Sequence, residues 1–294
     1  MSAAAPATTG ADDQPTSAWA AELAFATETA LAAGRVLMDR YERLERIDHK
    51  SARDVVTEAD HESEALIIAA IRERSPADAI LAEESGAHPA ASDAGGTAHA
   101  SAGGATVPEA NGRVWVIDPL DGTVNYANGL PVFCASIGLV VDGMPVVGVV
   151  LDPTRFELFA ATADGPATLN GRAIRASGKE KLSDWVVSLS LSGRSVQSRA
   201  RAIRREIRIS RSMGSAALAL AYVGNGRFDA FVQESSLSLW DVAAAGLIAE
   251  RGGAVVSSFG GGPWYDPTQE SRSIGVIAAA PVHHRRIVTL ANAR

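Results

Sequence analysis

Apolar and polar positions divide the chain into a helical first part and a strand-rich second part. Between residues 19 and 44, apolar side chains recur at steps of three and four, which predicts a long amphipathic helix. A second such pattern follows Asp60, which we interpret as an N-cap, and ends at Ser75-Pro76. From residue 114 onward short apolar runs predict strands, interrupted by helices near 213–226, near 240–251 and at the C-terminus.

Two segments lack the apolar residues that a core requires. Residues 1–17 have neither the basic start nor the apolar centre of a signal peptide, so we expect a disordered tail. Residues 86–112 are rich in Gly, Ala, Ser and Thr, and we expect a flexible insertion there, because they bury too little surface to offset their ordering entropy. We expect residues 18–294 to form a single domain that carries this insertion.

Composition and charge narrow the class of protein. Of the 294 residues, 47% are hydrophobic and 21% are charged, which is typical of a globular protein. The net charge of −7 argues against nucleic acid or an anionic membrane surface as a partner. The chain has one cysteine and no apolar run of the roughly 18 residues that span a membrane. We therefore expect a cytoplasmic protein without disulfides.

Acidic residues recur where a predicted apolar element meets a loop or a helix. Asp118 and Asp121 follow the run Val-Trp-Val-Ile, and their charges repel each other unless a cation lies between them. Similar junctions carry three further carboxylates, those of Asp54, Glu83 and Asp241. Carboxylates with few histidines suit a hard cation such as Mg²⁺, and the Leu120 carbonyl could add one more oxygen.

Each carboxylate also has a local structural interpretation. Asp241 lies at a predicted helix start, where a carboxylate stabilises the positive end of the helix dipole. Asp54 could cap a turn, and Glu83 with Glu84 could form a solvated loop pair. Their recurrence at one type of position favours a shared metal site over separate structural roles.

Gly122-Thr123 follows the two aspartates and begins a predicted helix. Backbone N–H groups at a helix start are free to bind phosphate, and the Thr123 hydroxyl can bind a water or a phosphate oxygen. A phosphate beside a carboxylate-held metal is the arrangement that metal-assisted hydrolysis of a phosphomonoester requires.

The motifs resemble those of the inositol monophosphatase family, in a superfamily that also contains fructose-1,6-bisphosphatases and bisphosphate nucleotidases. The matching stretches are DVVTEAD, EES, WVIDPLDGTVNYANGLPVFCASIGL, GPATLNG, MGSAALALAYVGNGRFDAF and LWDVAAAGLIAERGG, in the family's order. The resemblance implies an α/β fold of alternating helix and sheet layers, an αβαβα sandwich. It also implies a Mg²⁺-dependent phosphatase that is a homodimer and, as in many members, is inhibited by lithium.

Residue by residue, the resemblance implies a complete site. Two or three Mg²⁺ ions would bind to Glu83, Asp118, the Leu120 carbonyl, Asp121 and Asp241. Glu83 would also orient the attacking water, which Thr123, held by Asp54, would polarise. The Gly122 and Thr123 amides would hold the phosphate. The substrate would contact Gly214, Ser215, Ala216 and Glu234.

The sequence does not identify a single substrate. Glu234 favours a phosphorylated polyol, with myo-inositol 1-phosphate as the first choice. Histidinol phosphate, fructose 1,6-bisphosphate and adenosine 3′,5′-bisphosphate are alternatives for the same metal core. Four arginines on one predicted helical face are either solvated or contact an anionic substrate or a subunit; they are Arg201, Arg204, Arg205 and Arg208. A non-catalytic regulatory scaffold is the alternative from another class, although every matched ligand is present.

Overall fold

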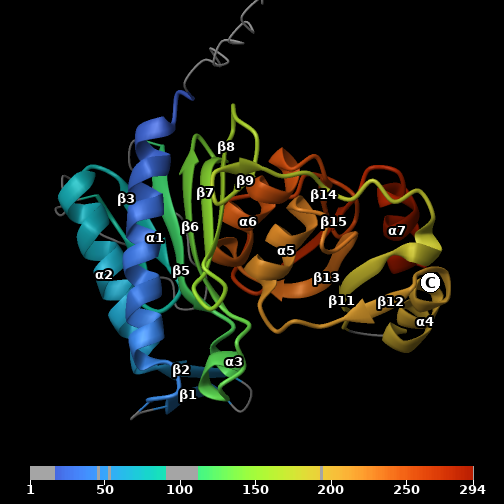
Figure 1. The fold of residues 1–294 in the computed structure, drawn as a ribbon, viewed down its shortest axis with the longest axis horizontal. Coiled ribbons are helices and arrows are strands. Elements are labelled where there is room, and N and C mark those ends of the chain that lie inside the picture. The colour runs from blue at the N-terminus through green and yellow to red at the C-terminus, as the bar shows by residue number, and fades with distance from the viewer. Residues whose placement is uncertain (1–16, 45–46, 52–53, 91–111, 193–194, 294) are drawn as a thin grey trace, which may run out of the picture.

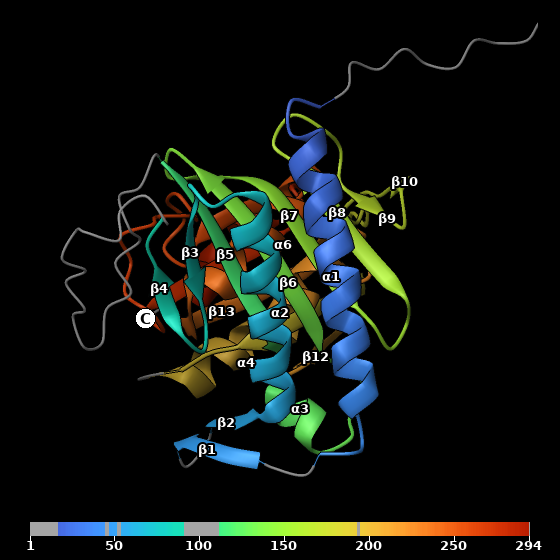
Figure 2. The same ribbon diagram turned by 90° about the vertical axis from the view of Figure 1, so that its left-hand side faces the viewer.

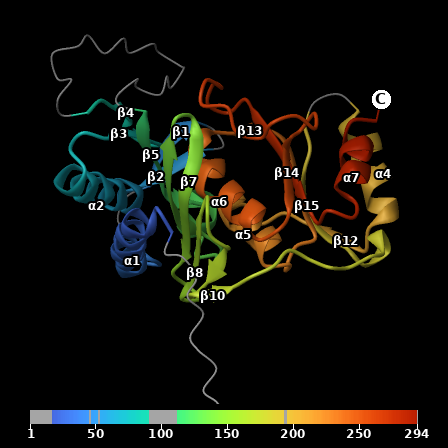
Figure 3. The same cartoon turned by 90° about the horizontal axis from the view of Figure 1, so that it is seen from above.

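The fold is a stack of five alternating helix and sheet layers (Figures 1 and 3). The computed structural model describes residues 17–44, 47–51, 54–90, 112–192 and 195–293. Helices α1 (Ala20–Arg40) and α2 (Glu58–Arg74) form the first layer. Helices α5 (Ala216–Gly224) and α6 (Leu239–Arg251) separate the two large sheets, and α4 (Val196–Glu206) and α7 (His284–Ala291) cover the far face. This confirms the predicted αβαβα architecture.

The first sheet is mainly antiparallel and has the strand order β10-β9-β8-β7-β6-β5-β3-β4. Strands β3 and β5 pair in parallel, and β5 to β10 form an antiparallel meander. The strands are β3 (Ala79–Ala82), β4 (Gly86–His88), β5 (Arg113–Asp121), β6 (Cys134–Val141), β7 (Met144–Asp152), β8 (Glu157–Thr162), β9 (Thr168–Leu169) and β10 (Arg172–Ala173).

The second sheet is mixed and has the strand order β12-β11-β13-β15-β14. Its strands are β11 (Val186–Ser190), β12 (Ile209–Arg211), β13 (Ala230–Leu237), β14 (Val255–Ser258) and β15 (Ile274–Ala279). A separate hairpin of β1 (Ile47–Ser51) and β2 (Asp54–Thr57) precedes α2. Two short helices complete the described elements, namely α3 (Thr123–Ala127) and the 3₁₀ helix η2 (Leu182–Asp184).

Helix α1 lies beside α2 across the outer face of the first sheet (Figure 2). Its buried side chains include Ala26, Ala30, Ala33 and Leu37, which follow the predicted steps of three and four. The helix ends at Arg40, and Leu44, the last residue of the predicted pattern, packs against the same core from the connection that follows. The pattern therefore predicted the buried face correctly and overestimated the helix length by about one turn.

Helix α6 packs unusually close to the first sheet, because glycines of β6 and β7 face its backbone. A Cβ added at Gly148 would lie 2.6 Å from the Ala244 oxygen, and one added at Gly138 would lie 3.2 Å from the Ala243 Cβ. Contacts below 3.0 Å do not occur without displacement of a neighbour. The position of α6 relative to this sheet is therefore set by the absence of side chains at these glycines.

The described residues change the expected boundaries of the two low-complexity segments. Strand β4 lies within the expected insertion and pairs antiparallel with β3, so residues 86–88 are part of the sheet. Residues 91–111, and residues 1–16 of the expected tail, lie outside the described residues. Ser17 is described, and its hydroxyl donates to Asp164. Among the described residues, no helix combines the length and apolar composition that a membrane crossing requires.

Candidate active site

A β-bulge at the end of β5 brings Asp118 and Asp121 to the same side of the strand. Side chains three residues apart on a regular strand point to opposite faces. Here Asp118 pairs with Ser136 and Asp121 with Cys134, so two residues of β5 lie opposite a single residue of β6. The strand thus runs through both aspartates and ends at Asp121, three residues beyond the predicted strand RVWVID.

Asp118, Asp121 and Asp241 form one acidic cluster. An oxygen of each carboxylate lies within 4.8 Å of the others, and Asp118 and Asp121 are almost completely buried. Glu83 lies beside this group, since its carboxyl group contributes to the raised pKa of Asp118. The structure therefore brings together all four carboxylates that were predicted to bind metal.

Protein hydrogen bonds use one oxygen of each of the three aspartates. Oδ1 of Asp118 accepts from the Leu120 amide at 3.0 Å. Oδ2 of Asp121 accepts from the Ser215 hydroxyl at 2.6 Å and from the Ala217 amide at 2.7 Å. Oδ2 of Asp241 accepts from the Ser238 amide at 2.6 Å. These hydrogen bonds orient the three carboxylates.

Two of these contacts are also helix caps. Asp121 lies at the N-terminus of α5, and Asp241 forms a capping box with Ser238 at the start of α6. The structural interpretation of Asp241 is therefore correct, and it holds together with membership of the cluster. The bulged strand and both interlayer helices converge on the acidic cluster.

Burial and mutual repulsion dominate the electrostatics of the cluster. Burial raises the pKa of Asp118 well above its usual range, and the charges of Glu83 and Asp121 act in the same direction. Burial and the charge of Asp121 likewise raise the pKa of Asp241 well above its usual range. Burial raises the pKa of Asp121, although hydrogen bonds from Ser215 and nearby amides oppose this.

A divalent cation fits this donor set. Buried carboxylates that raise one another's pKa are stabilised in their charged form by a cation among them. All the donors are oxygens, which suits Mg²⁺. The residues that could hold it are those of the acidic cluster, with Glu83 and the carbonyl of Leu120 beside them.

Thr123 forms the second part of the site, and its carboxylate partner is Asp60. The Thr123 hydroxyl lies 3.0 Å from Oδ1 of Asp60 and 3.0 Å from the Leu120 carbonyl oxygen. Asp54 was expected from the sequence to hold Thr123, whereas the contact that the structure describes is made by Asp60. The Asp54 side chain lies outside the described part of the structure, and its backbone begins β2.

Asp60 was interpreted from the sequence as an N-cap, and its actual position explains the difference. Thr57 is the N-cap of α2, and Asp60 closes a capping box by accepting from the Thr57 amide at 2.8 Å. The signal was present in Thr57-Glu58-Ala59-Asp60, which fits the capping-box pattern. Nothing in that local pattern indicated a further contact with Thr123, 63 residues away.

Gly122 and Gly214 are placed where only glycine fits. Gly122 has φ 96°, and a Cβ there would lie 2.9 Å from the Val132 carbonyl oxygen. Gly214 has φ 74°, and a Cβ there would lie 2.9 Å from the Asn125 side chain. Asn125, whose role was not predicted from the sequence, donates from Nδ2 to the carbonyls of Val132 and Met213 at 2.8 Å each. It thereby ties α3 to the turn at Gly214.

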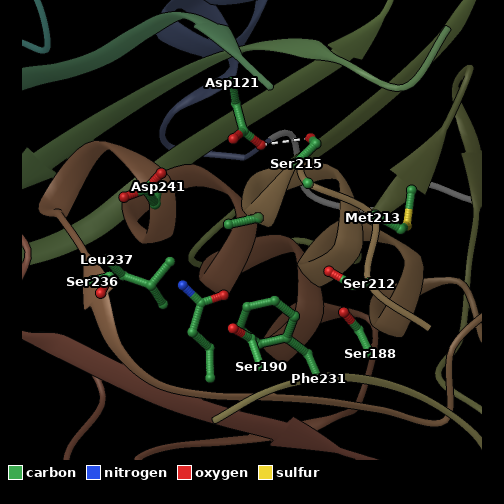
Figure 4. A pocket seen from close by; sticks show the side chains of 13 residues that line it. Asp121, Ser188, Ser190, Ser212, Met213, Ser215, Phe231, Ser236, Leu237 and Asp241 are labelled. Atoms are coloured by element: carbon green, nitrogen blue, oxygen red, sulfur yellow. Dashed lines mark hydrogen bonds between the residues drawn. The ribbon is translucent and has the colours of Figure 1, made fainter. Parts of the chain in front are cut away.

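A pocket of about 260 Å³ opens beside Asp121 and Asp241 (Figure 4). The predicted turn of Gly214, Ser215 and Ala216 lines it. The remaining lining residues are mostly hydroxyl, amide or apolar side chains, namely Ser188, Ser190, Ser212, Met213, Phe231, Gln233, Ser236 and Leu237. None of the described residues lining this pocket is Lys, Arg or His.

Glu234 has a different environment from the one predicted. Its oxygens accept from Arg199 at 2.8 Å each, and Oε2 also accepts from the Ser192 amide at 2.8 Å. The hydrogen bonds from Arg199 lower the pKa of Glu234. Its neighbours along β13, Gln233 and Ser236, line the pocket, and Glu234 is not among the described lining residues. Its predicted contact with substrate stays a prediction.

The predicted arginine face is only partly a helical face, and it lies away from the acidic cluster. Helix α4 ends at Glu206, so Arg208 lies beyond it and pairs with Asp184 at 2.7 Å. Arg201, Arg204 and Arg205 line a separate open hollow of about 410 Å³ on α4, in the layer beyond the five-stranded sheet (Figure 1). These arginines therefore line a different hollow from the acidic pocket, and whether they are solvated or contact an anionic substrate or a subunit stays open.

Comparison with known proteins gives a consistent result. The model of the inositol monophosphatase family matches residues 19–294. The Nus factor SuhB of Pseudomonas aeruginosa is 37% identical over 81% of this chain and 86% of its own. The inositol-1-monophosphatase of Synechocystis is 36% identical over 81% of this chain and 78% of its own.

Solved structures agree with the sequence comparisons. The inositol monophosphatase of Anabaena superposes with a TM-score of 0.73 at 33% identity, covering 92% of this chain and 94% of that one. An inositol monophosphatase of Thermotoga maritima gives a TM-score of 0.78 at 30% identity, covering 92% and 97%. With the layered fold and the acidic cluster, these matches show that the chain belongs to the inositol monophosphatase family.

Proposed function

We propose that the protein is a Mg²⁺-dependent phosphomonoester hydrolase. The observation that carries this proposal is the convergence of three buried aspartates and Glu83 beside a polar pocket. Buried like charges are costly to maintain, and a divalent cation is the partner that makes the arrangement favourable. A bound Mg²⁺ supplies Lewis-acid stabilisation of phosphate oxygens and lowers the pKa of water.

The residues of the chain have distinct roles in this proposal. Asp118, Asp121, Asp241, Glu83 and the Leu120 carbonyl hold the cation. The Glu83 carboxylate orients the attacking water, and the Thr123 hydroxyl, held by Asp60, polarises it. The amides of Gly122 and Thr123 hold the phosphate, and the Gly214–Ala216 turn positions the alcohol part of the substrate.

The polarity of the pocket narrows the substrate class. Serine hydroxyls and the Gln233 amide suit a neutral leaving group that carries several hydroxyls. A second phosphate would find no cationic side chain among the described lining residues. We therefore favour a monophosphate of a neutral polyol, with inositol 1-phosphate first, over fructose 1,6-bisphosphate and adenosine 3′,5′-bisphosphate. Histidinol phosphate, whose leaving group carries positive charge, remains a second choice.

The test is phosphate release from these four substrates, with and without Mg²⁺. The Asp121→Asn variant is the matched control, because its side-chain oxygen can still accept from Ser215 and Ala217. We expect Mg²⁺-dependent release from inositol 1-phosphate by the native protein and none by the variant. Equal turnover of a bisphosphate would refute the substrate class, and release by the variant would refute the role of the cluster.

A scaffold without catalytic activity is the second candidate, because the relative from Pseudomonas aeruginosa is named as a Nus factor. This alternative does not need the carboxylates of the cluster. It predicts that Asp121→Asn leaves the cellular role unchanged. Loss of that role in a variant that stays folded would exclude the scaffold as the sole function.

A further inference from the structure

A buried glutamate on α2 lies outside the proposed metal ligands and binds the turn that carries one of them. Glu64 is 4% exposed. Its Oε2 accepts from the Glu84 amide at 2.8 Å, and its Oε1 accepts from the Ser85 amide at 2.9 Å. Both oxygens of the carboxylate are thus directed at consecutive backbone amides of the turn that follows Glu83. Among the described residues, no ion pair joins Glu64 to a cationic side chain.

The turn is also held by its own strands and by a side-chain contact, in which the Ser85 hydroxyl lies 2.6 Å from Nε2 of His88. Ala82 pairs with Gly86 across β3 and β4, so Glu83, Glu84 and Ser85 span the turn between paired strands. The Glu83 amide donates to the Ile117 carbonyl at 3.2 Å. The backbone at Glu83 is therefore held by β5 on one side and by Glu64 on the other, and these contacts aim its carboxylate at Asp118.

Glu64 is part of one face of α2 that contacts three segments of the site. Residues at i, i+3 and i+4 lie on the same face of a helix. Asp60 binds the Thr123 hydroxyl, and the Ser63 hydroxyl donates to the Pro119 carbonyl at 3.0 Å. Ser63 and Glu64 are almost fully buried, so neither serves the solvent-facing side of the helix.

We propose that Glu64 is a positioning residue that fixes Glu83 in the geometry required for metal binding. It does so through the Glu84 and Ser85 amides, without touching metal or substrate. The inference rests on the proposed function, because it assumes that Glu83 is a ligand. Residues that orient metal ligands commonly affect metal affinity 10–100-fold when they are replaced.

The test is Glu64→Gln, with Glu73→Gln on the exposed side of the same helix as control. Glutamine keeps the shape and offers one acceptor oxygen, so one of the two amides loses its partner. Mg²⁺ binding is followed by calorimetry, and amide hydrogen exchange is followed over residues 82–88. We expect faster exchange in this turn and a Mg²⁺ dissociation constant raised about 10-fold or more. Raised Mg²⁺ should restore most of kcat, with KM for the phosphomonoester little changed.

The outcomes separate this inference from the proposed function. Faster exchange with an unchanged Mg²⁺ dissociation constant would show a structural role only, and would overturn the inference. A native protein that neither binds Mg²⁺ nor releases phosphate would instead refute the proposed function. If Glu64→Gln fails to fold, Glu64→Asp gives the same comparison, because it keeps the charge and withdraws the carboxylate from the two amides.

Discussion

The Thr123 hydroxyl lies 3.0 Å from the Asp60 carboxylate, and this contact joins the start of α3 to the first turn of α2. Oδ2 of Asp60 is already held by the Thr57 amide and hydroxyl, at 2.8 and 2.6 Å. A hydroxyl has a single proton, so Thr123 donates either to Asp60 or to the Leu120 carbonyl at a given moment. When the Leu120 carbonyl has another partner, the Thr123 proton points to Asp60. The lone pairs of the Thr123 hydroxyl can then accept a hydrogen bond from water.

This relationship predicts how Thr123 variants behave. Thr123→Val keeps the shape and removes the hydroxyl, so we expect phosphate release to fall about 100-fold or more, as for loss of a group that assists proton transfer. Thr123→Ser keeps the hydroxyl and should retain most of the activity. Steady-state kinetics at saturating Mg²⁺ provides the comparison. Equal loss in both variants would contradict the role of the hydroxyl.

The acidic cluster predicts an unusual dependence of stability on pH. Burial raises the folded-state pKa of Asp118 above its unfolded value, so the folded protein binds more protons than the unfolded chain. Without metal, the free energy of unfolding should therefore fall as pH rises above about 4, the pKa of an unperturbed aspartate. Urea unfolding in EDTA across this range measures the effect. Saturating Mg²⁺ should oppose the fall, because it binds only the native state.

Asp118→Asn tests the same repulsion by mutation. An asparagine oxygen can still accept from the Leu120 amide, and one buried charge disappears. We expect the metal-free variant to be more stable than the native protein at neutral pH, by about 1 kcal/mol or more. It should also lose activity and stabilisation by Mg²⁺. A destabilised metal-free variant would show that repulsion in the cluster is not significant.

Replacement of Arg199 should lower the free energy of unfolding more than its position on a basic helix suggests. Its side chain is 9% exposed and binds the carboxylate of Glu234 and the carbonyls of Ser192 and Ala291. Loss of one partner of a largely buried ion pair leaves an uncompensated charge. We expect Arg199→Met to lower the free energy of unfolding by about 3 kcal/mol. Arg205→Met, at an exposed position on the same helix, should change it by about 0.5 kcal/mol or less.

The close packing of α6 predicts that Gly148→Ala affects the site from a distance. The new Cβ would meet the Ala244 backbone, so α6 must move and Asp241 must move with it. We expect destabilisation of about 1–3 kcal/mol. Weaker Mg²⁺ binding in calorimetry should accompany it. Gly178→Ala, where a Cβ would meet nothing within 4 Å, is the matched control.

Local patterns in the sequence predicted what local physics determines. Apolar spacing indicated the buried face of α1, and Gly252-Gly253 marked the end of α6 at Arg251. The layered arrangement of these elements came from the family resemblance, since periodicity does not say which sheet a helix covers. The bulge in β5 was not predicted either. Pro119 was a sign of it, because proline cannot donate a hydrogen bond to a neighbouring strand.

Contacts between distant residues explain why the site could not be predicted in full from the sequence. The capping role of Asp60 already explained its position in the sequence, so nothing there indicated its contact with Thr123. Glu234 matched a motif position, yet its partner Arg199 lies 35 residues earlier on a helix of another layer. Charge and spacing along the chain cannot identify such pairs, because the fold alone brings them together.

In the acidic cluster, Asp118 and Asp121 belong to a strand of the first sheet, and Asp241 belongs to the helix layer behind it. Neither layer alone contains the complete donor set. During refolding, a cation can therefore be captured with full affinity only after α6 has docked on β5 and its neighbours. Contacts between segments so far apart in the chain form late. The rate of metal binding during refolding would then report when the two layers dock, independently of when secondary structure forms.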